Sequence, residues 1–114
     1  MIKTIIALSI FAIGSLNAQS VFKAEIGCNP GYKVPWMFCI KSIKLDGRIE
    51  NNMNLQMKYG GGATKITKDL SEHFNLTVSP SGSQKYYVKI TNSNGKEVFY
   101  DEKANKYSAI KVGN

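Results

Sequence analysis

The sequence predicts an all-β fold, an immunoglobulin-like β-sandwich of seven or eight antiparallel strands. Apolar and polar residues alternate with period two along most of the chain, which is typical of strands with one buried face. Turn signals such as Asp46-Gly47 and Asn92–Gly95 separate the alternating segments. These segments recur roughly every ten residues, the spacing that indicates a β-sandwich.

The alternation places the strands in order. Phe22, Ala24, Ile26 and Cys28 share one face of the first strand. The segment 37–45 is denser in apolar residues, as expected for a central strand or one that carries a bulge. Further strands are expected over 49–59, 74–78, 85–91, 96–101 and 107–112.

Two details qualify this pattern. Thr67–His73 is the only segment that offers a helical turn. The tight Asp46-Gly47 hairpin pairs the second and third strands in one sheet, whereas the usual seven-strand sandwich has them in opposite sheets. A variant of the immunoglobulin-like topology is therefore expected.

Residues 1–18 have the layout of a cleaved secretory signal. A short basic start at Lys3 precedes the apolar run 4–13, and Ala18 offers the cleavage site. The apolar run is too short to remain as a membrane span. The sequence thus predicts a single exported domain over residues 19–114, periplasmic or secreted, with no membrane span.

The charge is strongly basic and comes almost wholly from lysine. The chain has 15 Lys and Arg against 8 Asp and Glu, a net charge of +7, and Arg48 is its only arginine. Lysine is a hydrated point charge suited to loose attraction, whereas arginine suits planar recognition of phosphate. We therefore expect an acidic protein or a polyanion as partner, and no sequence-specific recognition of nucleic acid.

The two cysteines of an exported chain predict one disulfide, Cys28–Cys39. Closing a loop of this length stabilises the fold by roughly 3 kcal/mol in the chain-entropy model. A redox-active pair is the weaker alternative, because the chain has no Cys-x-x-Cys motif.

No residue grouping in the sequence indicates catalysis or a cofactor. His73 is the only histidine and has no neighbouring ligands at metal-site spacing, so we interpret it as a surface or capping residue. Gly60-Gly61-Gly62 is followed by Lys65 but does not match a phosphate-binding loop, and it is expected to end a strand. A non-enzymatic protein is the prediction.

The candidate partner-binding residues are Lys58, Lys85, Tyr87 and Lys89, which project from the outward faces of two predicted strands. If those strands are neighbours, the four residues form a basic strip with an aromatic ring, which could hold single-stranded nucleic acid or a sugar. The alternative interpretation is a solvated sheet face whose lysines serve solubility and edge protection.

The segment Cys39–Lys103 resembles the curli-assembly anti-amyloid family (CsgC/CsgH-like). The resemblance lies in Cys39–Ile43, Phe74–Ser79 and the closing hairpin Tyr87–Tyr100. It implies an immunoglobulin-like sandwich in the periplasm that keeps amyloid subunits from aggregating. Part of that family carries Cys-x-Cys at the first core strand, where this chain has Met37 and Cys39, so a redox role is not implied.

The leading functional hypothesis is therefore an exported, chaperone-like inhibitor of amyloid (curli-type) subunit aggregation. One alternative is an extracellular adhesion module that binds glycan or polyanion. Another is a secreted hydrolase inhibitor that uses the loop Asn29–Trp36 as a wedge, with Tyr32 and Trp36 as anchors. We favour the interpretation that these two aromatic residues cover the disulfide.

Overall fold

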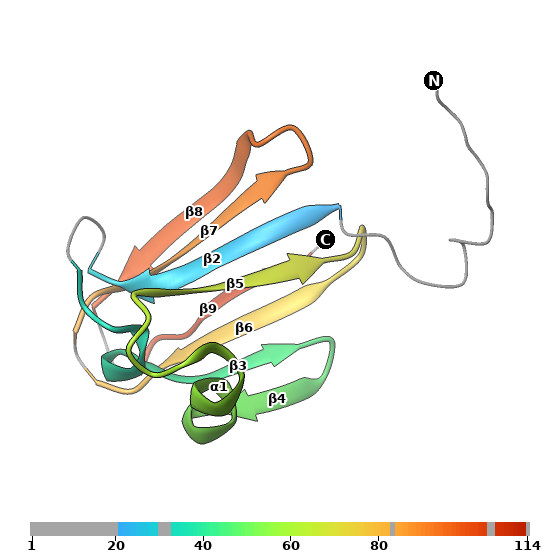
Figure 1. Cartoon of the computed structure of the whole chain (residues 1–114). Helices are drawn as coiled ribbons and strands as arrows, with labels where there is room; N and C mark the ends of the chain where they lie inside the picture. Colours follow the sequence, from blue (N-terminus) through green and yellow to red (C-terminus); the bar gives the residue numbers. More distant parts are fainter. Residues whose placement is uncertain (1–20, 30–32, 83, 105–106, 114) are drawn as a thin grey trace.

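The protein is a two-layer β-sandwich. The computed structural model describes residues 21–29, 33–82, 84–104 and 107–113, so the predicted signal sequence 1–18 lies outside it. These described residues form eight strands in two four-stranded sheets, ordered β5-β2-β7-β8 and β4-β3-β6-β9 (Figure 1). Every paired neighbour is antiparallel. The predicted all-β sandwich is confirmed.

The elements have the following bounds: β2 Phe22–Cys28, the 3-10 helix η2 Trp36–Phe38, β3 Ile40–Leu45, β4 Arg48–Asn51, α1 Asn52–Tyr59, β5 Lys65–Leu70, β6 Asn75–Pro80, β7 Tyr86–Asn92, β8 Glu97–Lys103 and β9 Ile110–Gly113. No helix in the described part of the chain is long and apolar enough to cross a membrane.

Both predicted hairpins are present. Asp46 and Gly47 join β3 to β4 with φ angles of 51° and 85°, the positive values that a two-residue hairpin turn requires. Asn92–Gly95 join β7 to β8, and the Asn92 side chain accepts hydrogen bonds from the backbone N–H groups of Asn94 and Lys96. Because β3 and β4 lie in one sheet, the connectivity departs from the usual immunoglobulin order as expected.

The core lies between the sheets and follows the predicted alternation. Ala24 and Ile26 of β2 face inward with Val88 and Ile90 of β7, and all four are buried. The dense segment 37–45 is a short 3-10 helix followed by β3, whose partner β6 shifts register between Ile40 and Ser42. This strand is central and bulged, as predicted.

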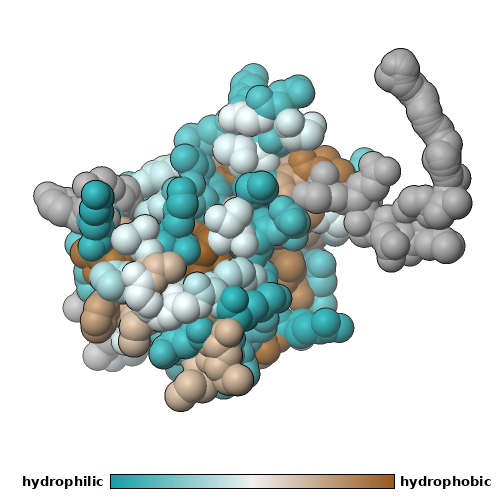
Figure 2. Space-filling view, viewed as in Figure 1, coloured by the Kyte–Doolittle hydropathy of each residue, from teal (hydrophilic) through white to brown (hydrophobic). Residues whose placement is uncertain are grey.

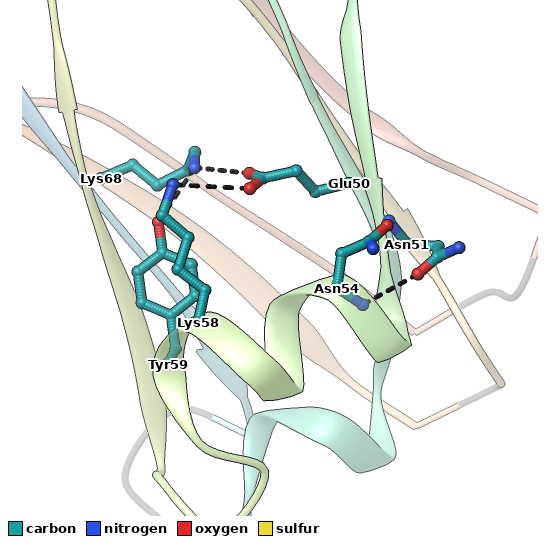
Figure 3. Close-up of polar contacts among 6 residues, drawn as sticks. All are labelled: Glu50, Asn51, Asn54, Lys58, Tyr59 and Lys68. Atoms are coloured by element: carbon teal, nitrogen blue, oxygen red, sulfur yellow. Dashed lines mark hydrogen bonds and ion pairs between the residues drawn. The ribbon is translucent and has the colours of Figure 1, made fainter.

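The expected strand over 49–59 is wrong beyond residue 51, because α1 takes its place. Asn51 caps the helix in a reciprocal pair of hydrogen bonds (Figure 3). The Asn51 side chain accepts from the Asn54 backbone N–H at 2.9 Å, and the Asn54 side chain accepts from the Asn51 backbone N–H at 3.1 Å. Met53 and Met57 are 63% and 83% exposed, so their alternation with polar residues is not a buried strand face. Pale brown atoms over α1 are visible in Figure 2. Gly60, expected to end a strand, ends this helix with φ 83°.

The expected helical turn at Thr67–His73 is also wrong, because its first part belongs to β5. Ile66, Lys68 and Leu70 face inward and alternate with exposed residues. Ile66 and Leu70 are four residues apart, which is typical of one face of a helix. Because the inward residue between them is a lysine, the sequence does not show the apolar alternation of a strand. His73 is exposed, as expected.

Candidate functional site

Three of the four predicted partner-binding residues lie together on the outer face of the β5-β2-β7-β8 sheet. Tyr87 and Lys89 belong to β7 and point outward, and Lys85 directly precedes that strand. The register sets Tyr87 between Gly27 of β2 and Glu102 of β8. We call this surface the tyrosine face.

Two tyrosines form the centre of the tyrosine face. The rings of Tyr87 and Tyr100 stack with centroids 6.0 Å apart and planes 18° from parallel. The Tyr87 hydroxyl donates to Glu25 at 2.6 Å, and the Tyr100 hydroxyl donates to Glu102 at 2.7 Å. A side chain at Gly27 would meet the Tyr87 ring, since its Cβ would lie 3.0 Å from Cε1. The glycine and the two carboxylates thus hold the rings in place before any partner arrives.

The lysines of the tyrosine face are paired with carboxylates. Glu25 lies 3.5 Å from the Lys65 amine and 3.8 Å from that of Lys89, and Lys85 lies 3.1 Å from Glu102. The outward positions carry four lysines and four carboxylates: Lys23, Lys65, Lys85, Lys89, Glu25, Asp69, Glu97 and Glu102. The face is therefore charge-balanced, and it lacks the excess of positive charge that the sequence suggested.

The ionisation of these groups fixes the direction of the hydrogen bonds. Burial raises the pKa of Glu25, but the Tyr87 hydroxyl and the lysines Lys89 and Lys65 outweigh it, so this pKa is lowered overall. Burial and the bond to Glu102 raise the pKa of Tyr100 to about 12. At neutral pH the tyrosines therefore donate and the carboxylates accept.

Lys58 does not join the tyrosine face. It lies on α1, where its amine is 3.5 Å from Glu50 of β4 (Figure 3). The same carboxylate binds Lys68 of β5 at 2.8 Å, and Lys68 also contacts the Tyr59 hydroxyl at 3.0 Å. The sequence missed this cluster because the helix was not predicted. The one signal of this cluster in the sequence is Lys68, a charged residue between the apolar residues Ile66 and Leu70.

Lys68 and Glu50 join the two sheets at the edge formed by β4 and β5. The Lys68 side chain is only 7% exposed although it carries a charge. The hydrogen bond from Lys68 lowers the pKa of Glu50. An inward-pointing charge on an edge strand is a recognised obstacle to further strand pairing. We interpret the pair as structural.

The predicted disulfide Cys28–Cys39 is confirmed, with 5.7 Å between the two Cα atoms. Trp36 lies beside it and is fully buried, and its indole nitrogen donates to the Gly60 carbonyl at 2.9 Å. Trp36 therefore belongs to the core and cannot serve as the exposed anchor of an inhibitor wedge. Tyr32 lies outside the described residues.

Among the recesses beside the sheets, two differ clearly in the character of their lining. One, of about 380 Å³, is polar and includes Asp46, Glu50 and Lys68. The other, of about 400 Å³, is apolar and includes Phe22 and Phe99. Within the described ranges, no three histidine, cysteine, aspartate or glutamate side chains gather as a metal site would require.

Comparisons of the chain with protein-family models, with curated proteins and with solved structures found no match. The resemblance to the curli-assembly anti-amyloid family therefore stays a prediction. The disulfide is compatible with a secreted or periplasmic location.

Proposed function

We propose that this protein is an exported, non-enzymatic binding protein, a periplasmic chaperone-like inhibitor of amyloid subunit aggregation. The disulfide, the predicted signal sequence and the family resemblance support this proposal. The observation that carries it is the stacked Tyr87–Tyr100 pair between paired lysines and carboxylates.

The tyrosine face suits short-lived contact with an extended chain. The two stacked rings form an apolar surface, and their side chains are already held in one conformation. Binding therefore costs less side-chain entropy than it would for mobile rings. Lys85 and Lys89 attract acidic side chains of a subunit, while Glu25 and Glu102 limit that attraction. A partner is thus held weakly and released, as a chaperone of aggregation-prone chains requires.

The edges of this sheet are protected against joining a growing fibril. Lys68 points inward from β5 at one edge. At the other edge the register of β8 against β7 shifts between Ile90 and Thr91, which makes Val98 an extra residue, and such bulges oppose edge-to-edge pairing. An inhibitor with these edges can contact subunits through its face without itself extending their sheets.

The experiment that tests the proposal is fibril growth of a purified curli-type major subunit with a substoichiometric amount of this protein. We expect a longer lag with the wild-type protein and a largely lost effect with Tyr100→Ala, which removes half of the stacked pair. Tyr107→Ala is the matched control, because Tyr107 is 84% exposed and lies between β8 and β9, outside the strands that form the tyrosine face. An unchanged lag with the wild-type protein, or equal activity of Tyr100→Ala, would refute the proposal.

A second candidate is a glycan-binding adhesion module, which the same two rings favour. Nearly parallel rings flanked by carboxylates and lysines can stack on a sugar and bond to its hydroxyls. NMR titration with neutral oligosaccharides tests it: shifts confined to Tyr87 and Tyr100, without fibril inhibition, would favour this candidate over the first.

A further inference from the structure

The outer face of the other sheet, β4-β3-β6-β9, differs in composition from the tyrosine face. The register aligns Ile49, Lys44, Thr77 and Lys111 in one row across the four strands. Lys44 and Lys111 are exposed and occupy outward positions next to buried neighbours in their strands. We call this surface the lysine face.

Hydroxyl groups lie among the lysines of this face. Ser42 and Ser79 are partners in the register of β3 and β6, and Thr77 lies between Lys44 and Lys111. Lys41, the extra residue at the β3 bulge, is exposed next to Ser42. Ser42, Thr77 and Ser79 are each partly exposed.

Among the residues that the structure describes, the lysine face has no internal counter-charge. Among the described residues, no carboxylate occupies an outward position of these four strands, and Lys41, Lys44 and Lys111 make no ion pair. Glu50 of β4 pairs with the inward Ile43 and binds Lys68. The three lysines are therefore available to an external anion.

We propose that the lysine face binds an anionic polysaccharide through its sulfate or carboxylate groups. Lys44 and Lys111 are two strands apart, a separation of about 10 Å, so they match charges repeated along a polymer. Lysine amines bind such groups as point charges. The side-chain hydroxyls of Ser42, Thr77 and Ser79 can form hydrogen bonds with the sugar hydroxyls that lie between the charged groups of the polymer.

The composition of the face disfavours nucleic acid and acidic peptide. The described outward positions of these strands hold no aromatic ring, which single-stranded nucleic acid needs for base stacking. The linings of the two recesses described above include none of Lys41, Lys44 and Lys111, so neither recess offers a peptide side chain a pocket beside these lysines. The site is separate from the tyrosine face and does not depend on the function proposed for it.

The test measures binding to heparin, which carries sulfates, and to polygalacturonate, which carries only carboxylates. At about 50 mM salt we expect Lys44→Gln/Lys111→Gln to bind either polymer about 30-fold more weakly, and the slope of log affinity against log salt to fall by about two. Binding to heparin alone would assign the site to sulfate, and binding to both would assign it to either anion.

The matched control is Lys23→Gln/Lys96→Gln, which removes the same charge from exposed lysines away from the lysine face. It should keep nearly all of the affinity. Equal losses in the two variants would show that only net charge matters and would overturn the proposal. The same conclusion follows if the wild-type protein binds neither polymer, or binds duplex DNA or polyglutamate as tightly.

The fibril assay separates this site from the function proposed above. Lys44→Gln/Lys111→Gln leaves Tyr87, Tyr100 and their carboxylates intact, so we expect it to inhibit fibril growth as well as the wild-type protein does. Loss of polymer binding with unchanged fibril inhibition supports two separate faces. Loss of both activities would overturn that separation.

Discussion

The two outer faces of the sandwich are built from the same kind of strand and carry similar numbers of lysines. They differ in that, within the described residues, the lysines of one face are paired with carboxylates and those of the other are not. On the tyrosine face, Glu25 and Glu102 engage Lys65, Lys89 and Lys85. On the lysine face, no described carboxylate occupies an outward position of the strands. The charge of a sheet face is thus set across strands by the register, and alternation within one strand does not reveal it.

Lys68 lies in a third kind of environment, the interior of the sandwich. Lys68 points into the sandwich and needs Glu50 because its amine is nearly removed from water. A lysine–carboxylate pair therefore has a structural role at this edge and an electrostatic role on the tyrosine face. The same substitution at the two kinds of carboxylate separates these roles.

The largest expected effect is that of Glu50→Gln on stability. The change leaves the charged Lys68 amine, whose side chain is 7% exposed, with two neutral oxygens, the new amide oxygen and the Tyr59 hydroxyl, and without the negative charge of Glu50. We expect the free energy of unfolding to fall by about 2 kcal/mol, and the melting temperature by roughly 10 °C. Thermal denaturation followed by circular dichroism measures it.

Glu102→Gln is the control, because its partner Lys85 is about half exposed. Such a surface pair contributes little to folding, so the melting temperature should stay unchanged. If Glu102→Gln destabilised the protein as much as Glu50→Gln, the distinction between structural and surface pairs would be wrong.

The second effect concerns the electrostatics of the tyrosine face. Glu25→Gln/Glu102→Gln removes the counter-charges of Lys65, Lys85 and Lys89 but keeps an oxygen for each tyrosine hydroxyl. Introduced together with Lys44→Gln/Lys111→Gln, it should restore heparin affinity by roughly tenfold, because an unpaired lysine cluster now exists on the other face. Heparin binding at low salt measures the gain, and no gain would mean that pairing does not explain the difference between the faces.

Much of the fold could be predicted from the sequence, because alternation and turn chemistry are local. Both hairpins and the disulfide depend on residues that are near one another in the chain. The bulged central strand is indicated by its local density of apolar residues, although the bulge itself forms against the distant strand β6. The helix α1 was missed because the alternation of Met53, Leu55 and Met57 outweighed the weaker signal of the asparagine cap. β5 was missed because a buried lysine interrupts its apolar face.

The candidate site was predictable only in part, for a physical reason. Alternation placed Lys85, Tyr87 and Lys89 on one outward face, which the structure confirms. Their partners Glu25, Tyr100 and Glu102 come from other strands, and the register that brings them together is a tertiary property. The alternation places Lys58 on a strand, whereas it lies on the helix α1 and points away from the tyrosine face.

The smallest expected effect is a change with pH that needs no substitution on the tyrosine face. The pKa values of Glu25 and Glu102 are both lowered from the ordinary 4.5, so these carboxylates stay ionised at neutral pH and begin to take up protons only as the pH falls below that value. Protonation removes the counter-charges, whereas heparin keeps its sulfate charges. In the Lys44→Gln/Lys111→Gln protein, heparin affinity should therefore stay nearly constant from about pH 7 down to 4.5 and rise by roughly two- to fivefold as the pH is lowered further. Adding Glu25→Gln/Glu102→Gln should abolish most of that rise, and circular dichroism at each pH shows that the fold is retained. A rise of the same size without the two carboxylates would mean that other groups govern the charge of this face.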